Sequence, residues 1–184
     1  MISDQLKEQT KSNHQSLEKK LIGKMRAMRN KQDYIDLLTI FYSYFGGLEQ
    51  LIQGNVLKNK VPDYDLRRKA NSLSADIELL GGRHPALAAQ HFLPAITNHA
   101  EALGAMYVIE GSTLGGKIIS EMITKQLGIT DGVSFFNGYG ADTISMWQRF
   151  QAVLNQPENL PGDAIIAAAN DTFLKFSEWF DLNA

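Results

Sequence analysis

Apolar residues recur every three or four positions through almost the whole of this chain, which is the spacing of helices that bury one face. In residues 3–21 that face carries Leu6, Thr10, His14, Leu17 and Leu21. Asn30 is a good helix N-cap with Asp33 three residues later, and a broad apolar stripe follows it until just before Gly54. No segment alternates with the period of two that is typical of strands for more than a few residues. The pattern predicts an all-α helical bundle.

Turn residues divide the rest of the chain into further helices. They are expected at about 65–81, 96–128, 142–155 and 161–182. Gly81 and Gly82 are a natural stop for the first, Asp142 can cap the third, and Pro161 suits the first turn of the last. Residues 83–95 should form at most short helical pieces, and FFNGYG at 135–140 is too rich in glycine and aromatic residues to be helical. We expect a single domain over residues 1–184.

Composition excludes several classes of protein. The 184 residues are 44% hydrophobic, which is enough for one core that also encloses a pocket. With 18 basic and 20 acidic residues the formal net charge is −2, which argues against broad nucleic-acid binding and against docking on an acidic membrane. The absence of cysteine excludes disulfides, zinc–thiolate sites, iron–sulfur clusters and a cysteine nucleophile. No apolar run approaches 18 residues and the N-terminus lacks a signal-peptide pattern, so we expect a cytoplasmic protein.

His14 is an unusual residue for the apolar stripe of its helix. Most often such a residue is a core histidine that is hydrogen-bonded to a neighbour. Glu18, one turn later on the same face, could instead accept a hydrogen bond from one ring nitrogen and leave the other free as a ligand. Lys7 and Lys11 lie on or near the same side, where a cation could pair with a carboxylate of a bound molecule. Both interpretations of His14 are compatible with the residues alone.

The second unusual feature is Gly111-Ser112-Thr113-Leu114-Gly115-Gly116 inside an otherwise good helix. Each interior glycine costs about 1 kcal/mol relative to alanine, so something should offset the three. The glycines could allow a close helix crossing, since Gly111 and Gly115 have the small-xxx-small spacing. Alternatively, they could kink the helix and lay bare backbone against a flat ligand. A phosphate loop is disfavoured, because no strand precedes the glycines and Lys117 is not in a Walker A arrangement.

These segments together resemble a known family. GAMYVIEGSTLGGKII (104–119) resembles the distal-helix motif of bacterial haem oxygenases, and KEQTKSNHQSLEKKL (7–21) resembles their proximal-helix segment. FFNGYGADTISMWQRF (135–150) resembles the segment after the distal helix in the biliverdin-producing branch that is often associated with bacteriophytochromes. The resemblance spans most of the chain, in the family's order and spacing.

The resemblance implies a role for each matching residue. His14 takes the position of the proximal ligand to the haem iron, and Glu18 that of the carboxylate that orients it. The distal backbone over the opposite haem face corresponds to Gly111, Ser112, Gly115 and Gly116. The positions of haem propionate contacts correspond to Lys7, Tyr107 and, by a looser match, Lys175. Ser112 replaces the aspartate of mammalian-type members, so protons would arrive through water held by backbone carbonyls and by the hydroxyls of Ser112 and Thr113.

The resemblance also implies the reaction and the partners. Haem would be substrate and cofactor, cleaved by O2 and external electrons to biliverdin, CO and iron(II). The electrons would come from a reductase or ferredoxin, and biliverdin could be passed to a bilin-binding photoreceptor. A non-catalytic haem carrier or sensor on the same fold is the alternative, and a helical relative that binds a thiamin-like molecule is a more distant one. A di-iron site is disfavoured, since no Glu-x-x-His motif accompanies His91 and His99.

Overall fold

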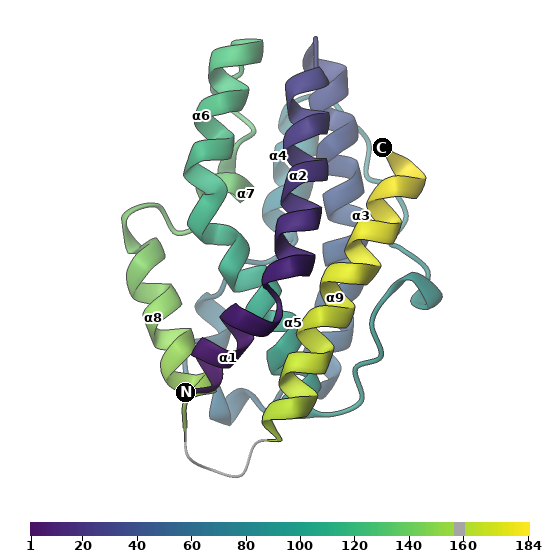
Figure 1. Ribbon diagram of the computed structural model, residues 1–184. Coiled ribbons are helices and arrows are strands. Elements are labelled where there is room, and N and C mark those ends of the chain that lie inside the picture. Colours follow the sequence, from purple (N-terminus) through teal and green to yellow (C-terminus); the bar gives the residue numbers. More distant parts are fainter. Residues whose placement is uncertain (157–160) are drawn as a thin grey trace.

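The computed structural model describes residues 1–156 and 161–184, and every regular element in these two ranges is a helix. The α-helices are α1 (Ile2–Gln9), α2 (Lys11–Ala27), α3 (Lys31–Asn55), α4 (Asn71–Leu79), α5 (His99–Gly111), α6 (Gly116–Leu127), α7 (Ser134–Asn137), α8 (Thr143–Leu154) and α9 (Gly162–Asn183). Short 3-10 helices lie at Lys58–Lys60, Tyr64–Leu66, Gln90–Phe92, Ser112–Gly115 and Gly140–Asp142. The predicted all-α bundle is confirmed (Figure 1). No helix of the described part is both long and apolar enough to cross a membrane.

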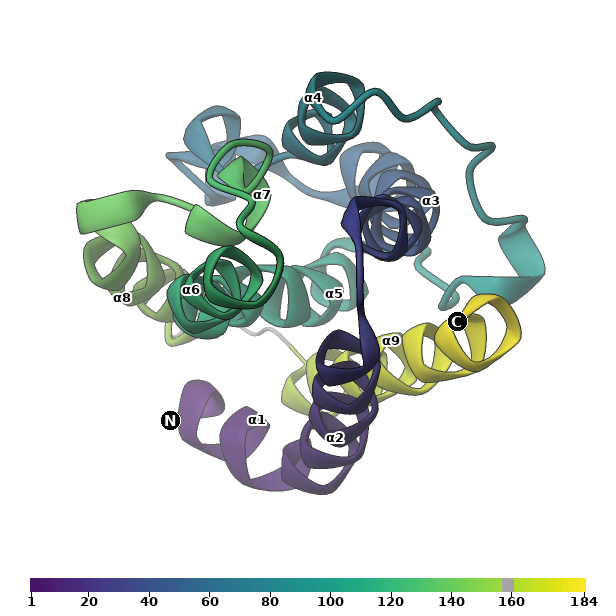
Figure 2. The same ribbon diagram turned by 90° about the horizontal axis from the view of Figure 1, so that it is seen from above.

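The core forms where α3, α5 and α9 pack together. Aromatic rings of α3 meet Phe176 of α9, with ring centroids 4.8 Å apart for Tyr44, 5.0 Å for Phe45 and 5.1 Å for Phe41. The hydroxyl of Tyr44 donates to the carbonyl of Thr172 at 2.9 Å, so the ring is fixed at both ends. Figure 2, which looks down the bundle, shows α2 beside α9, α6 beside α8, and α2 and α6 apart from each other. α2 and α6 therefore pack against different parts of the bundle and do not pack against each other along their length.

The first predicted helix is divided at Thr10. Its φ of −98° and ψ of −5° end α1, and its Oγ1 donates to the carbonyl of Leu6 at 2.7 Å. Figure 1 shows α1 leaving α2 at an angle. Leu6, Thr10 and Leu17 are buried as predicted, but His14 is exposed. The prediction that His14 lies on a buried face is wrong: the hydrogen bonds between α2 and α9 are made at Asn13 and Lys20, and the His14 ring borders Phe173 of α9 and is otherwise exposed.

Several helix ends follow the sequence signals. Asn30 and Asp33 form a reciprocal capping box at the start of α3, and Gly81, with φ of +85°, ends the turn after α4. α4 is shorter than predicted: it begins at Asn71 and not near residue 65. One reason is that the N–H of Arg68 donates to the hydroxyl of Tyr139 at 2.8 Å, where a helix would have required a carbonyl. Asp142 precedes α8 as predicted, although its side chain makes no cap hydrogen bond.

Residues 135–140 were expected to contain no helix, and this is wrong for the first half of the segment. Ser134–Asn137 form the single turn α7. The carboxylate of Asp76, on α4, accepts hydrogen bonds from the N–H and hydroxyl of Ser134 and from the N–H of Phe135. This side chain from a distant part of the chain starts the turn, so no local pattern predicts it. Gly138 and Gly140 have φ of +56° and +57°, and Gly138 is the residue at which α7 ends.

Candidate functional site

The candidate site lies between α2 and α6, which are neighbours in the view of Figure 1 and stand apart from each other in Figure 2. At one end of the two helices, the side-chain amide of Gln126 donates to the carbonyls of Met28 at 2.6 Å and Arg26 at 3.2 Å. At the other end, the hydroxyl of Tyr107 on α5 interacts with the side chain of Thr10. A hollow of about 470 Å³ follows α2, lined by Gln15, Glu18, Lys19, Ile22, Gly23 and Arg26. α2 is thus tied to α6 near one end and borders α5 near the other, and open space lies along α2.

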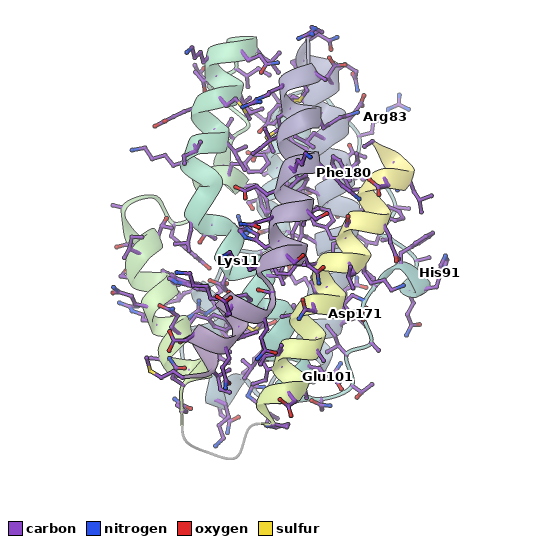
Figure 3. The ribbon with its side chains drawn as sticks, viewed as in Figure 1. Lys11, Arg83, His91, Glu101, Asp171 and Phe180 are labelled. Atoms are coloured by element: carbon purple, nitrogen blue, oxygen red, sulfur yellow. The ribbon has the colours of Figure 1, made fainter. Side chains whose placement is uncertain are left out.

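An exposed polar stripe runs along α1 and α2. Lys7, Lys11, His14 and Glu18 lie three or four residues apart and are all exposed. Figure 3 places Lys11 beside the lower part of α2, on the side toward α6. The His14 ring contacts Phe173 of α9, with ring centroids 5.5 Å apart. No hydrogen bond joins His14 to Glu18 in the described structure, so the predicted orienting contact is not formed here.

The opposite wall is the face of α5 and α6 that carries Gly111 and Gly115. Gln126 reaches α2, and Met122, Ile118 and Gly115 precede it at helical steps of four, four and three. The same face of the helix therefore brings Gly115 toward α2. Gly115 is exposed, and a Cβ built on it would meet no atom within 4 Å. Leu114 and Ile118 beside it are 43% and 72% exposed, which makes this wall apolar.

The three glycines of 111–116 differ in their surroundings. A Cβ on Gly116 would overlap the carbonyl oxygen of Phe136, so this glycine is needed for packing on α7. A Cβ on Gly111 would lie 3.8 Å from the Trp147 ring, an ordinary contact. Gly115 alone has open space in front of it. The expectation that Gly116 faces a ligand is therefore replaced by a packing role, while Gly115 retains the position expected of a ligand-facing residue.

The hydroxyls of Ser112 and Thr113 are already bonded. Ser112 Oγ donates to the carbonyl of Ile109 at 2.7 Å and accepts from Arg68 Nη2 at 2.6 Å. Thr113 is buried, and its hydroxyl donates to the carbonyl of Glu110 at 2.6 Å. These contacts satisfy carbonyls at the point where α5 gives way to the 3-10 turn. In this arrangement neither hydroxyl has a proton free to donate to water in the space between α2 and α6.

A buried charged cluster, which was not predicted from the sequence, lies behind the turn. Arg67 Nη1 contacts the carboxylate of Glu110 at 2.7 Å, and Arg67 Nη2 contacts Asp63 at 2.8 Å. The hydroxyl of Tyr139 donates to the same Glu110 carboxylate at 2.9 Å. Burial raises the pKa of Glu110, and the positive charge of Arg67 opposes that rise. A signal was present in the sequence: Glu110 is the one acidic residue in 102–116, and it stands between the apolar run 102–109 and the glycines.

The two other predicted contact residues lie in different places. Tyr107 is half-buried between Thr10 and Trp147, with its ring centroid 5.6 Å from that of Trp147, and burial raises its pKa. It therefore lies on α5 next to the residue that joins α1 and α2. Lys175 forms an ion pair with Glu178 at 3.3 Å. It lies two residues before Ser177, which contacts α2, and so points to another side of α9.

The remaining histidines lie elsewhere. His84 contacts Ser74 at 2.9 Å and Glu78 at 2.5 Å, and is exposed in its turn as expected. His99 Nδ1 accepts a hydrogen bond from the N–H of Leu57 at 3.1 Å. Figure 3 shows His91 at the edge of the molecule away from α6. Among the described residues, no three His, Cys, Asp or Glu side chains gather as a metal site would require.

A comparison with protein-family models settles the family, because the model described as "Heme oxygenase" matches residues 1–182. The chain belongs to the haem oxygenase family. It is similar to a "Heme oxygenase" of Xanthomonas campestris pv. campestris (strain 8004), with 32% identity over 124 residues that cover 67% of this chain and 72% of the relative. The fold is similar to that of a haem oxygenase from Leptospira interrogans, with a TM-score of 0.76 and 20% identity over 98% of each chain.

Membership of the haem oxygenase family identifies the chain as a haem-degrading enzyme that binds haem as substrate and prosthetic group. The residues that α2 and the turn after α5 expose suit such a molecule. They offer an exposed imidazole on α2 and, in the turn, an open glycine flanked by the exposed apolar side chains of Leu114 and Ile118. A neutral imidazole is a common protein ligand to haem iron, and a glycine lets backbone approach a flat ring closely.

Proposed function

We propose that haem lies between α2 and α6, with His14 as the only protein ligand to its iron. The observation that carries this proposal is the exposed imidazole of His14 on the uncovered face of α2, across from a turn whose Gly115 has no atom in front of it. Haem in this position would cover the face of α2 that carries His14 and the turn that carries Gly115, and so remove both from water. Glu18, one turn from His14 on the same face, would orient the imidazole once the ligand is bound.

Gly115 and Gly111 would form the wall on the other side of haem. Because neither carries a side chain, backbone approaches the ring closely and leaves room only for small molecules and water. When bound, haem supplies the redox-active iron and is itself oxidised to biliverdin, CO and iron(II) with O2 and external electrons. Water held by carbonyls of the turn would carry protons, since the hydroxyls of Ser112 and Thr113 are bonded to carbonyls.

Lys7 and Tyr107 would contact the haem propionates. Lys7 is exposed two turns before His14 on the same side, and the half-buried Tyr107 lies on α5 next to Thr10. An exposed lysine contributes at most about 1 kcal/mol to an ion pair, so these residues would set the orientation of haem more than its affinity. Lys175 is not included, because it is paired with Glu178 on another side of α9.

The remaining proposals concern the partner proteins and the cellular location. We infer that a reductase or ferredoxin delivers the electrons, and that biliverdin passes to a bilin-binding photoreceptor. The support for the second inference is the resemblance of residues 135–150 to the branch associated with bacteriophytochromes. We also place the protein in the cytoplasm, where such a photoreceptor and reductase would be available.

His14→Ala tests the proposed ligand directly. The wild-type ferric complex should show the absorption spectrum of histidine-ligated haem, and the variant should lose that spectrum. Added imidazole should restore it by occupying the space that the missing ring leaves. His91→Ala, at an exposed histidine far from α6, is the matched control and should leave the spectrum unchanged. A His14→Ala protein with the wild-type spectrum and turnover would contradict the assignment.

A further inference from the structure

The segment FFNGYG at 135–140 lies directly behind the turn that faces α2. The carbonyl of Phe136 occupies the space that a Gly116 side chain would need, so backbone meets backbone there. Gly138 and Gly140, on either side of Tyr139, both have left-handed φ angles, which residues with side chains rarely adopt. This backbone path returns the half-buried Tyr139 ring toward α5.

The hydroxyl of Tyr139 joins two parts of the chain. It donates to the carboxylate of Glu110 at 2.9 Å and accepts the backbone N–H of Arg68 at 2.8 Å. Burial and the negative charge of Glu110 raise the pKa of Tyr139 well above its usual value, so the hydroxyl stays protonated and remains a donor. A hydroxyl that donates and accepts in this way holds the backbone of residue 68 at a fixed distance from α5.

The side chain of Arg68 continues from there to the turn. Its Nη2 donates to the carbonyl of Ile109 at 2.8 Å and to Ser112 Oγ at 2.6 Å, and its Nη1 donates to the carbonyl of Phe135 at 3.0 Å. The guanidinium also lies 3.9 Å from the centroid of the Phe135 ring. Arg68 therefore contacts both the last turn of α5 and α7. Tyr139 holds its backbone, and its side chain holds the turn at residues 112–115.

We propose that Tyr139 is a positioning residue for residues 112–115, acting through Arg68 and Glu110. It does not line the space between α2 and α6, and no contact with haem is assigned to it. Its effect on the reaction rests on the proposed function, in which this turn forms the wall opposite His14. Loss of the hydroxyl removes one donor from Glu110 and leaves the N–H of Arg68 without its acceptor, which loosens the attachment of Arg68 to the turn.

Tyr139→Phe removes that hydroxyl and keeps the ring. Tyr44→Phe is the matched control, since Tyr44 is a buried tyrosine whose hydroxyl donates one hydrogen bond, to Thr172, away from the turn. Amide hydrogen exchange is measured by NMR on the haem-free proteins. Residues 112–116 should exchange roughly tenfold faster in Tyr139→Phe, as expected when the hydrogen bonds to Glu110 and from Arg68 are lost. In Tyr44→Phe these residues should exchange faster only by the amount that a fall in global stability explains. Exchange that is equal in the two variants would overturn the proposal.

A double variant tests the route. If the effect passes through Arg68 to Ser112, the exchange changes of Tyr139→Phe and Ser112→Ala should be non-additive, whereas independent effects would add and contradict it. These measurements need no haem, so a failure of the proposed haem site would appear in the His14→Ala spectra instead. For the haem complex, Tyr139→Phe should shift the midpoint pH of the alkaline transition of the ferric spectrum. An unchanged midpoint would overturn the link between this turn and haem.

Discussion

Gly115 and Gly116 are adjacent in the chain and have opposite surroundings. Gly115 is exposed with open space where a side chain would begin, and Gly116 is buried against the carbonyl of Phe136. The sequence indicates that some interaction must offset the helix-destabilising cost of these glycines. It does not indicate which glycine packs against another helix and which faces a ligand. That division depends on α7, whose one turn is started by Asp76 from another helix.

The contrast between the two glycines predicts opposite effects of alanine. Gly115→Ala should leave the haem-free protein as stable as wild type, or stabilise it by up to about 1 kcal/mol of helix propensity. Gly116→Ala should destabilise it by about 1–3 kcal/mol, because backbone atoms must move. Thermal melts of the haem-free proteins measure both effects. Gly115→Ala should also lower the biliverdin formed per O2 consumed, since a methyl group would enter the wall opposite His14. A strongly destabilised Gly115→Ala protein that turns over normally would favour a packing role for Gly115 as well.

At the level of elements, α5 and α9 cross most closely at Gly104. A Cβ there would overlap the carbonyl of Ile165 and lie 2.9 Å from the Ala168 Cβ. The spacing of Gly111 and Gly115 suggests a close helix crossing there. The close crossing is instead made at Gly104, seven residues before Gly111. Periodicity and caps predicted the long helices well, including the capping box of Asn30. They failed at the start of α4 and at α7, where Tyr139 and Asp76 provide hydrogen-bond partners from distant parts of the chain.

The crossing predicts that Gly104→Ala destabilises the protein. The added methyl group meets backbone and a short side chain that cannot rotate away, so the two helices must separate, at a cost of about 1–3 kcal/mol. Gly23→Ala is the control: Gly23 is exposed within α2 and a Cβ there would meet nothing within 4 Å. Chemical denaturation of the haem-free proteins should give a lower midpoint for Gly104→Ala and an equal or higher one for Gly23→Ala. Equal midpoints for Gly104→Ala and wild type would show that the crossing can relax.

For the whole molecule, polar contacts attach α1 and α2 to the rest of the bundle. Asn13 donates to Asn170 at 2.7 Å, Lys20 forms an ion pair with Asp181, and Ser3 accepts from Asn155 at 2.9 Å. Leu6, Leu17 and Met25 are the buried apolar residues that accompany them. The family and the two facing segments could be predicted from sequence, because both carry local motifs. The exposure of His14 could not, since it depends on how α9 is placed beside α2, where Phe173 borders the His14 ring.

Haem turnover distinguishes a haem-degrading enzyme from a haem carrier. The protein is loaded with ferric haem and given a ferredoxin-based reducing system in air, and absorbance is followed through the reaction. An enzyme with haem held between α2 and α6 should lose the Soret band while biliverdin absorbance rises and CO is released. The His14→Ala variant should do this only when imidazole is added. A wild-type Soret band that persists under reducing conditions, with no biliverdin formed, would contradict the account and indicate a haem carrier.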